Sequence, residues 1–172
     1  MKKIILIISM VALVFSTQTT SAQDKAMTIV DVAVSVDDFS TLVTALKAAD
    51  LVGALQGDGP FTVFAPVNAG FAKIDSNTLN SLLAPENKEK LSAILTYHVV
   101  AGKISAADVA SALKAGNGKA ELKTLNGETL TAVSKDGGIF LMDKNGNYSK
   151  IAKTDVMASN GVIHIIEDVV MP

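Results

Sequence analysis

Three Asx-Gly dipeptides, spaced about ten residues apart, limit the folds open to this chain more than any other feature of its sequence. Asn126-Gly127, Asp136-Gly137 and Asn145-Gly146 each have the residue types that hairpin turns favour, because such turns need positive φ angles. Turn signals at this spacing indicate short antiparallel strands, which we predict at residues 120–124, 129–134, 139–142, 149–156 and 161–166. The last of these is apolar on both faces, as a central strand would be.

The residues before Gly116 follow a helical pattern, interrupted by a strand at 61–65. Asn68 is predicted to cap a short helix, and Ser105 with Asp108 has the spacing of a capping box. Another helix is predicted from an apolar face made of Phe39, Leu42, Val43 and Leu46. Asp37 or Asp38 is its predicted N-cap. Helices followed by an antiparallel meander predict an α+β domain, with the helices on one side or end of the sheet.

Composition narrows the functions open to the chain. It has 172 residues, of which 49% are hydrophobic and 19% charged, so it is not a disordered, highly charged binder. It has no cysteine, which excludes disulfides and thiolate ligands. All 15 basic residues are lysine and the net charge is −2. We therefore expect no nucleic-acid partner, since bidentate arginine contacts and a positive field are both missing.

The first 22 residues have the three-part layout of a secretory signal. Lys2 and Lys3 form a basic start, residues 4–15 are apolar, and small residues precede a predicted cleavage after Ala22. An uncleaved anchor is the alternative, although crossing a bilayer takes about 20 apolar residues. We expect a signal peptide at 1–22 and a mature chain without a transmembrane segment. That chain is expected to be secreted or otherwise extracytoplasmic, in the periplasm, at the cell surface or in the extracellular medium.

Three stretches, in this order, resemble the fasciclin domain: residues 61–71, 97–104 and 158–166. Residues 28–33 also resemble the opening helix of that family. The resemblance covers residues 27–172, and it implies a single fasciclin-like domain over residues 23–172 of the mature chain. The implied fold is a wedge-like β-sandwich with helices packed along one edge, which agrees with the α+β prediction.

The chain departs from the family pattern beside Asn68. Members usually carry Thr or Ser where this chain has Val67, and an acidic residue where it has Ala69. Gly70 then enters the first turn of the predicted helix, where a glycine costs about 1 kcal/mol relative to alanine.

The resemblance also implies contact residues for adhesion. In animal fasciclin domains a Tyr-His pair is associated with integrin attachment, and it corresponds to Tyr97 and His98 here. The structural alternative is that His98 is a partly buried imidazole that joins a helix to a strand through a backbone hydrogen bond. His164 alternates with apolar residues of the last strand, and we interpret it as structural.

A second implied contact precedes the last motif. Some animal members carry an acidic-aliphatic pair linked to integrin binding, and Asp155 and Val156 match that pair. Lys153 and Thr154 replace the glutamate and proline that usually come before it. The structural alternative is strand pairing, with alternate residues of 152–156 on one face.

No pattern of catalytic or metal-binding residues stands out. His98 and His164 lack a third ligand at helix or strand spacing, and the sequence has no HExxH motif. Residues 143–147 look like a calcium loop, but their glycine is in the fourth place, so a hairpin tip explains them better. Glu167 and Asp168 are adjacent and would point to opposite faces of a strand. We expect no enzyme activity, metal or cofactor.

These observations predict a secreted fasciclin-domain protein that acts in adhesion. Its partner would be a cell-surface or matrix protein or glycan, with binding to a second copy of itself left open. The alternative is an exported binding protein for a small apolar or lipid-like ligand, held in a pocket between the helices and the sheet.

Overall fold

The computed structural model describes residues 27–172. The predicted signal peptide, residues 1–22 with cleavage after Ala22, lies outside the described residues. Short 3-10 turns at Asp37–Phe39 and Pro85–Asn87 precede two of the helices. The α-helices are α1 (Ile29–Ser35), α2 (Ser40–Ala48), α3 (Val52–Gln56), α4 (Asn68–Phe71), α5 (Ser76–Leu83), α6 (Lys88–Tyr97) and α7 (Ala106–Ala115).

Seven strands of the described chain form one sheet in the order β2-β1-β7-β6-β5-β4-β3. Strands β3 to β7 form the predicted antiparallel meander, while β1 inserts parallel to β7. Strand β7 lies between β1 and β6, which confirms the prediction of a central strand. The strands are β1 (Phe61–Pro66), β2 (Val99–Ala101), β3 (Lys119–Lys123), β4 (Thr129–Lys135), β5 (Gly138–Met142), β6 (Tyr148–Ala158) and β7 (Gly161–Ile166).

The three evenly spaced Asx-Gly dipeptides, at residues 126–127, 136–137 and 145–146, lie in hairpin connections of the meander, as predicted. Asp136-Gly137 alone fills a connection between β4 and β5, and both residues have positive φ, 51° and 76°. The connections at Asn126-Gly127 and Asn145-Gly146 are longer, so positive φ is needed only at their glycines, 87° and 82°.

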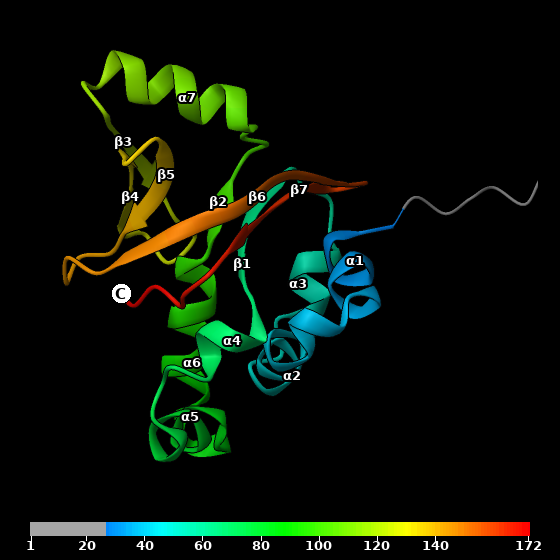
Figure 1. Cartoon of the computed structure of the whole chain (residues 1–172). Coiled ribbons are helices and arrows are strands. Elements are labelled where there is room, and N and C mark those ends of the chain that lie inside the picture. Colours follow the sequence, from blue (N-terminus) through cyan, green and yellow to red (C-terminus); the bar gives the residue numbers. More distant parts are fainter. Residues whose placement is uncertain (1–26) are drawn as a thin grey trace, which may run out of the picture.

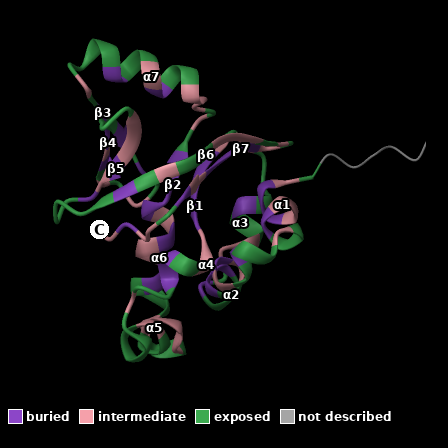
Figure 2. Cartoon of the chain, in the orientation of Figure 1, coloured by how far each residue is buried: buried purple, intermediate pink, exposed green. Residues whose placement is uncertain are grey.

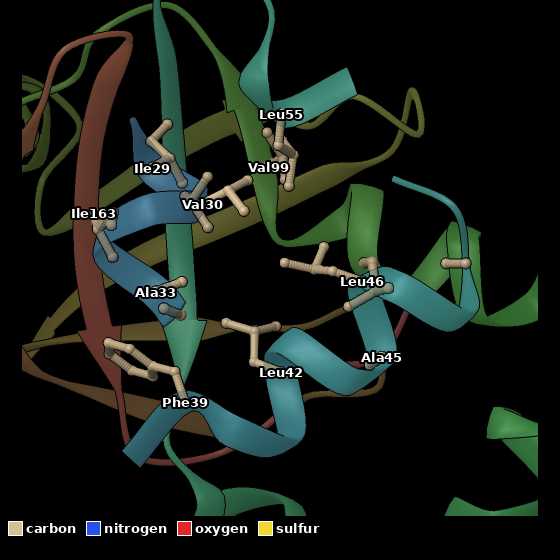
Figure 3. Close-up of a cluster of buried hydrophobic side chains, with 14 of the residues drawn as sticks. Ile29, Val30, Ala33, Phe39, Leu42, Ala45, Leu46, Leu55, Val99 and Ile163 are labelled. Carbon is tan, nitrogen blue, oxygen red and sulfur yellow. The ribbon is translucent and has the colours of Figure 1, made fainter. Parts of the chain in front are cut away.

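The central strands separate two cores, because alternate side chains of a strand point to opposite faces. Val63 and Ile163 face the helices and pack with residues of α1, α2 and α3. Figure 3 shows Ile163 together with the side chains of these helices. On the other face, Phe64 and Ile166 meet residues of β3, β4, β5 and α7. Figure 1 shows α1–α3 on one side of β1 and β7, with α7 on the far side of the sheet, and buried residues follow both strands (Figure 2). The α+β prediction is confirmed.

The sheet bends back on itself until its two ends nearly meet. Val100 of β2 forms a bridge with Thr124, which follows β3, and Leu125 N donates to Val99 O at 2.7 Å. Strands β2-β1-β7 therefore face strands β5-β4-β3 across the smaller core. This arrangement is the wedge that the family resemblance implies.

Two predicted helix caps are wrong. Asn68 Oδ1 accepts from Thr41 N at 3.0 Å and its Nδ2 donates to Asp37 O at 2.9 Å, so its side chain holds the start of α2 instead of α4. Neither Asp37 nor Asp38 caps α2, since both lie in the 3-10 turn before it. The predicted capping box of Ser105 and Asp108 is confirmed at the start of α7.

Tight packing explains why glycine occupies position 70, which the sequence alone does not show. A Cβ atom at this position would lie 2.6 Å from Glu167 O, so α4 approaches the chain just after β7 more closely than any other residue allows. This packing therefore requires glycine at position 70 despite its helix-propensity cost of about 1 kcal/mol relative to alanine.

Candidate functional site

Tyr97 and His98 lie where α6 ends and the chain enters β2, and both are buried. Tyr97 Oη donates to Thr129 O at 3.1 Å, which joins α6 to the start of β4. Burial, and after it the negative charge of Asp143, raises the pKa of Tyr97. The ring therefore belongs to the core as a neutral phenol.

His98 joins α6 to the C-terminal segment. Val170 N donates to Nε2 at 3.2 Å, so the ring proton is on Nδ1, which donates to Ile94 O at 2.8 Å. Burial lowers the pKa of His98 to about 4, so the imidazole is neutral at neutral pH. This geometry agrees with the structural interpretation. The contact role of Tyr97 and His98 stays a prediction, and neither side chain reaches the surface in this conformation.

Asp155 and Val156 lie in an irregular part of β6. The register of β6 against β7 shifts twice over residues 151–156, so these residues do not form the regular strand face that their alternation predicts. Asp155 has φ 56°, a left-handed conformation that Asp tolerates better than most residues. Its Oδ1 accepts from Ala106 N at 2.9 Å, the first residue of α7. Val156 is partly buried against the helix-side core.

A chain of hydrogen bonds behind Asp155 fixes the loop that leads into α7. Asp155 N donates to His164 Nδ1 at 3.3 Å, so His164 Nε2 carries the ring proton and donates to Ile104 O at 2.8 Å. Ile104 N in turn donates to Thr62 Oγ1 at 2.8 Å, and that hydroxyl donates to Gly102 O at 2.7 Å. These contacts agree with a structural role for His164.

The structure does not bring the two predicted contact pairs together. Within residues 27–172, no hydrogen bond or ion pair joins Tyr97 or His98 to the second pair. Phe64 lies between them: its N–H donates to His98 O at 2.9 Å, and its ring stacks on His164 with centroids 5.5 Å apart.

Sequence reasoning missed the role of Asn160, in the turn between β6 and β7. Its Oδ1 accepts from Ile29 N at 3.0 Å, at the start of α1. Its Nδ2 donates to Leu55 O at 2.8 Å and Gly57 O at 3.0 Å, at the end of α3. The Asn-Gly dipeptide that it forms with Gly161 signals a turn, but no local pattern shows which helices the side chain reaches.

The interior has little room for a ligand. A cavity between α1–α3 and the sheet measures about 20 Å³, and another beneath α6 about 10 Å³. One water molecule needs roughly 10–15 Å³, whereas ligand pockets measure roughly 300–1,000 Å³. Larger hollows lie at the surface: one of about 370 Å³ beside Asp58, Lys103 and Asn160, and one of about 320 Å³ between α1, α2 and α3.

The described part of the chain has neither a metal-binding cluster nor a membrane-spanning helix. Among residues 27–172, no three His, Asp or Glu side chains gather closely enough to hold a metal ion. Over the same residues, no helix has both the length and the apolar character needed to cross a bilayer.

Comparison with known proteins identifies the family of the chain. Residues 37–172 match the Fasciclin domain family. The chain belongs to the fasciclin family. The resemblance carried by its three motifs is thereby confirmed.

This fasciclin-family chain has relatives in bacteria and animals. It is 53% identical to Protein sll1483 of Synechocystis sp. over 152 residues, which are 88% of this chain and 77% of that protein. It is 33% identical to the transforming growth factor-beta-induced protein ig-h3 of Sus scrofa over 145 residues, which are 84% of this chain but 19% of that protein. Its fold matches a FAS1 domain pair from the insect cell adhesion molecule Fasciclin I, with a TM-score of 0.56 and 18% identity. That match covers 76% of this chain and 43% of that one.

Proposed function

We propose that this chain is an exported fasciclin-domain protein that acts by binding, in adhesion to a cell-surface or matrix protein. Residues 1–22 would be the signal peptide, and residues 23–172 would form a single domain outside the cytoplasm. The observation that carries the proposal is family membership over residues 37–172, together with a fold shared with an insect cell adhesion molecule.

The filled interior supports surface binding over ligand storage. The cavity between the helices and the sheet measures about 20 Å³, which is too small for a lipid-like molecule. A rigid scaffold that presents loops and strand edges to a partner fits this geometry better. The small-ligand alternative therefore has no site in the described interior.

Asp155 and Val156 are the better placed of the two predicted contact pairs. Within the described residues, β5 pairs with β6 only over Tyr148–Lys150, so the part of β6 that holds Asp155 has no strand on that side. Asp155 and Val156 are both partly exposed there. Tyr97 and His98 are buried, and their side chains hydrogen-bond to the start of β4 and to the C-terminal segment instead of facing solvent.

Bead attachment tests the proposed function. Beads coated with the purified chain from Gln23 onward are expected to attach to intact cells of the host, and attachment should rise steeply with coating density. One domain offers one modest site, so a dense array is needed for avidity. Beads that clump together without cells would identify homophilic binding. Folded protein that attaches to neither cells nor beads at any density would contradict the proposal.

The same assay tests Asp155. The variant Asp155→Asn keeps an acceptor oxygen for Ala106 N and a residue type that tolerates positive φ, but removes the charge. If the carboxylate contacts the partner, attachment should fall while the melting temperature stays unchanged. Unchanged attachment would remove Asp155 from the proposed contact, and Lys153→Gln serves as a neighbouring control because that side chain is exposed on the same strand.

A further inference from the structure

The outer face of the β3–β6 meander, which points away from the smaller core, carries a row of residues in cross-strand register. Lys119 pairs with Val133, Val133 with Phe140, and Phe140 with Lys150. Since paired residues share a face, one apolar and one aromatic side chain lie between two lysines. Helix α7 does not cover this face, because its buried residues belong to the core on the other side of the strands.

Aromatic surface is accessible on this face. Tyr148, two residues before Lys150 on β6, is 45% exposed. Val133 points outward yet is only 7% exposed, so the neighbouring side chains on the face cover it. Lys135 Nζ lies 4.9 Å from the centre of the Tyr148 ring, which places both side chains on the same side of the sheet.

The lysines of this face have no acidic partner. The ion pairs of residues 27–172 involve Lys73, Lys88 and Lys144, and none includes Lys119, Lys135 or Lys150. All three are exposed. Strand β3 adds one more lysine and one glutamate to the face, which leaves it positively charged on a chain whose net charge is −2. Unpaired positive charge concentrated on one face of an acidic protein indicates an anionic ligand.

We propose that this face binds an extended acidic polysaccharide that carries carboxylate or sulfate groups. The lysine ammonium groups would bind the anionic groups, and the rings of Phe140 and Tyr148 would pack against the apolar faces of the sugars. Neighbouring strands lie about 4.8 Å apart, so Lys119 and Lys150 would hold anionic groups roughly 14 Å apart across the face. A polysaccharide fits better than a nucleic acid, because the chain has no arginine to make bidentate contacts with phosphate groups.

This inference rests on the proposed function in one respect, since export would bring the face to such a polymer. It concerns a different face from that of Asp155 and adds a glycan to the proposed protein contact. Binding by purified protein can therefore be measured without cells.

Fluorescence anisotropy with labelled alginate, a polyuronate, tests the inference. Alginate should bind the protein from Gln23 onward, with neutral dextran of similar length as the negative control. The double variant K119Q/K150Q should weaken binding about tenfold, since each exposed ionic contact contributes modestly. The matched double variant K47Q/K90Q removes two exposed lysines from α2 and α6 and should change the dissociation constant less than twofold.

Tyr148→Ala separates stacking from charge alone. It should weaken alginate binding several-fold. The melting temperature of the protein should change little, because Tyr148 is exposed. Equal losses in both double variants, no binding of alginate, or tighter binding of oligothymidylate than of alginate would each overturn the inference. Failure of alginate binding with cell attachment intact would overturn the inference and leave the proposed function standing. Alginate binding without cell attachment would support the inference and contradict the proposed function.

Discussion

The neutral imidazole of His98 makes the stability of the fold depend on pH. Its pKa is about 4 in the folded chain, against an ordinary value of 6.5 when unfolded. Above pH 6.5 neither state binds a proton there, so the contribution to stability is complete. As the pH falls from 6.5 towards 4, the unfolded chain takes up a proton that the folded chain does not. The free energy of unfolding should therefore fall by about 3 kcal/mol across this range.

Urea denaturation at several pH values measures this effect. His98→Gln keeps an acceptor that can face Val170 N but cannot be protonated, so its stability lacks this contribution to the pH dependence. The variant should be less stable than the parent at pH 7, and the gap should narrow as the pH approaches 4.5. A gap that stays constant with pH would show that His98 is not held neutral. His98→Ala, which leaves Val170 N without a partner, should cost about 1–3 kcal/mol at pH 7.

Asp155 combines a positive φ with a hydrogen bond to α7, and substitutions can separate the two. Asp155→Gly relieves the backbone but removes the acceptor for Ala106 N, whereas Asp155→Ala loses both advantages. Thermal melts should give Asp and Asn equal stabilities, followed by Gly and then Ala, with Ala about 1–3 kcal/mol below the parent. If Ala were as stable as Gly, the positive φ would carry no cost at this position.

At the scale of elements, Asn160 joins three segments that are far apart in the sequence. Asn160→Ala removes hydrogen bonds to Ile29 N, Leu55 O and Gly57 O, and should lower the free energy of unfolding by about 3 kcal/mol. Hydrogen exchange should show the loss first at the amides of α1 and α3. The neighbouring variant Ser159→Ala, at an exposed side chain, should change stability by less than about 0.5 kcal/mol. Uniform loss of protection would mean that Asn160 does not hold these helices in particular.

Local patterns predicted the meander well because each of its turns is determined by adjacent residues in the sequence. Every strand of the meander begins and ends within two residues of its predicted bounds, and Ser105 forms its predicted capping box. Asn68 shows where this reasoning stops. Its position favours a local cap, but the side chain instead holds the start of α2, 27 residues earlier in the chain. Tertiary hydrogen bonds of this kind leave no periodic signal.

In the candidate sites too, local patterns could be predicted from the sequence and tertiary contacts could not. Sequence reasoning gave His98 two interpretations, an adhesion contact implied by the resemblance and a structural imidazole, and the structure supplies the partner, Val170, that local spacing could not reveal. The register shifts around Asp155 were equally hidden, because a bulge depends on the neighbouring strand as well as on the residues that form it. The lysine and aromatic face of β3–β6 emerges only once the cross-strand register is known.

At the scale of the whole molecule, β1 and β7 belong to both cores, so the cores should unfold together. Tyr97, at the end of α6, packs in the smaller core and Tyr148 lies on β6, whereas helices α1–α5 pack on the helix-side core. Near-ultraviolet signals from the tyrosines and far-ultraviolet signals from the helices therefore report on opposite sides of the wedge. Both should give the same urea midpoint, as a two-state transition requires.

Cavity variants in each core test this coupling directly. Leu42→Ala opens a cavity among the helices and Leu141→Ala opens one beneath the meander, and each should cost about 2–5 kcal/mol. Because the shared strands transmit the loss, each variant should shift the near- and far-ultraviolet midpoints equally, with one transition in both. If Leu141→Ala moved the tyrosine transition and left the helix transition in place, the two sides would be separate folding units. The continuous pairing of β1 with β7 would then be too weak to couple them.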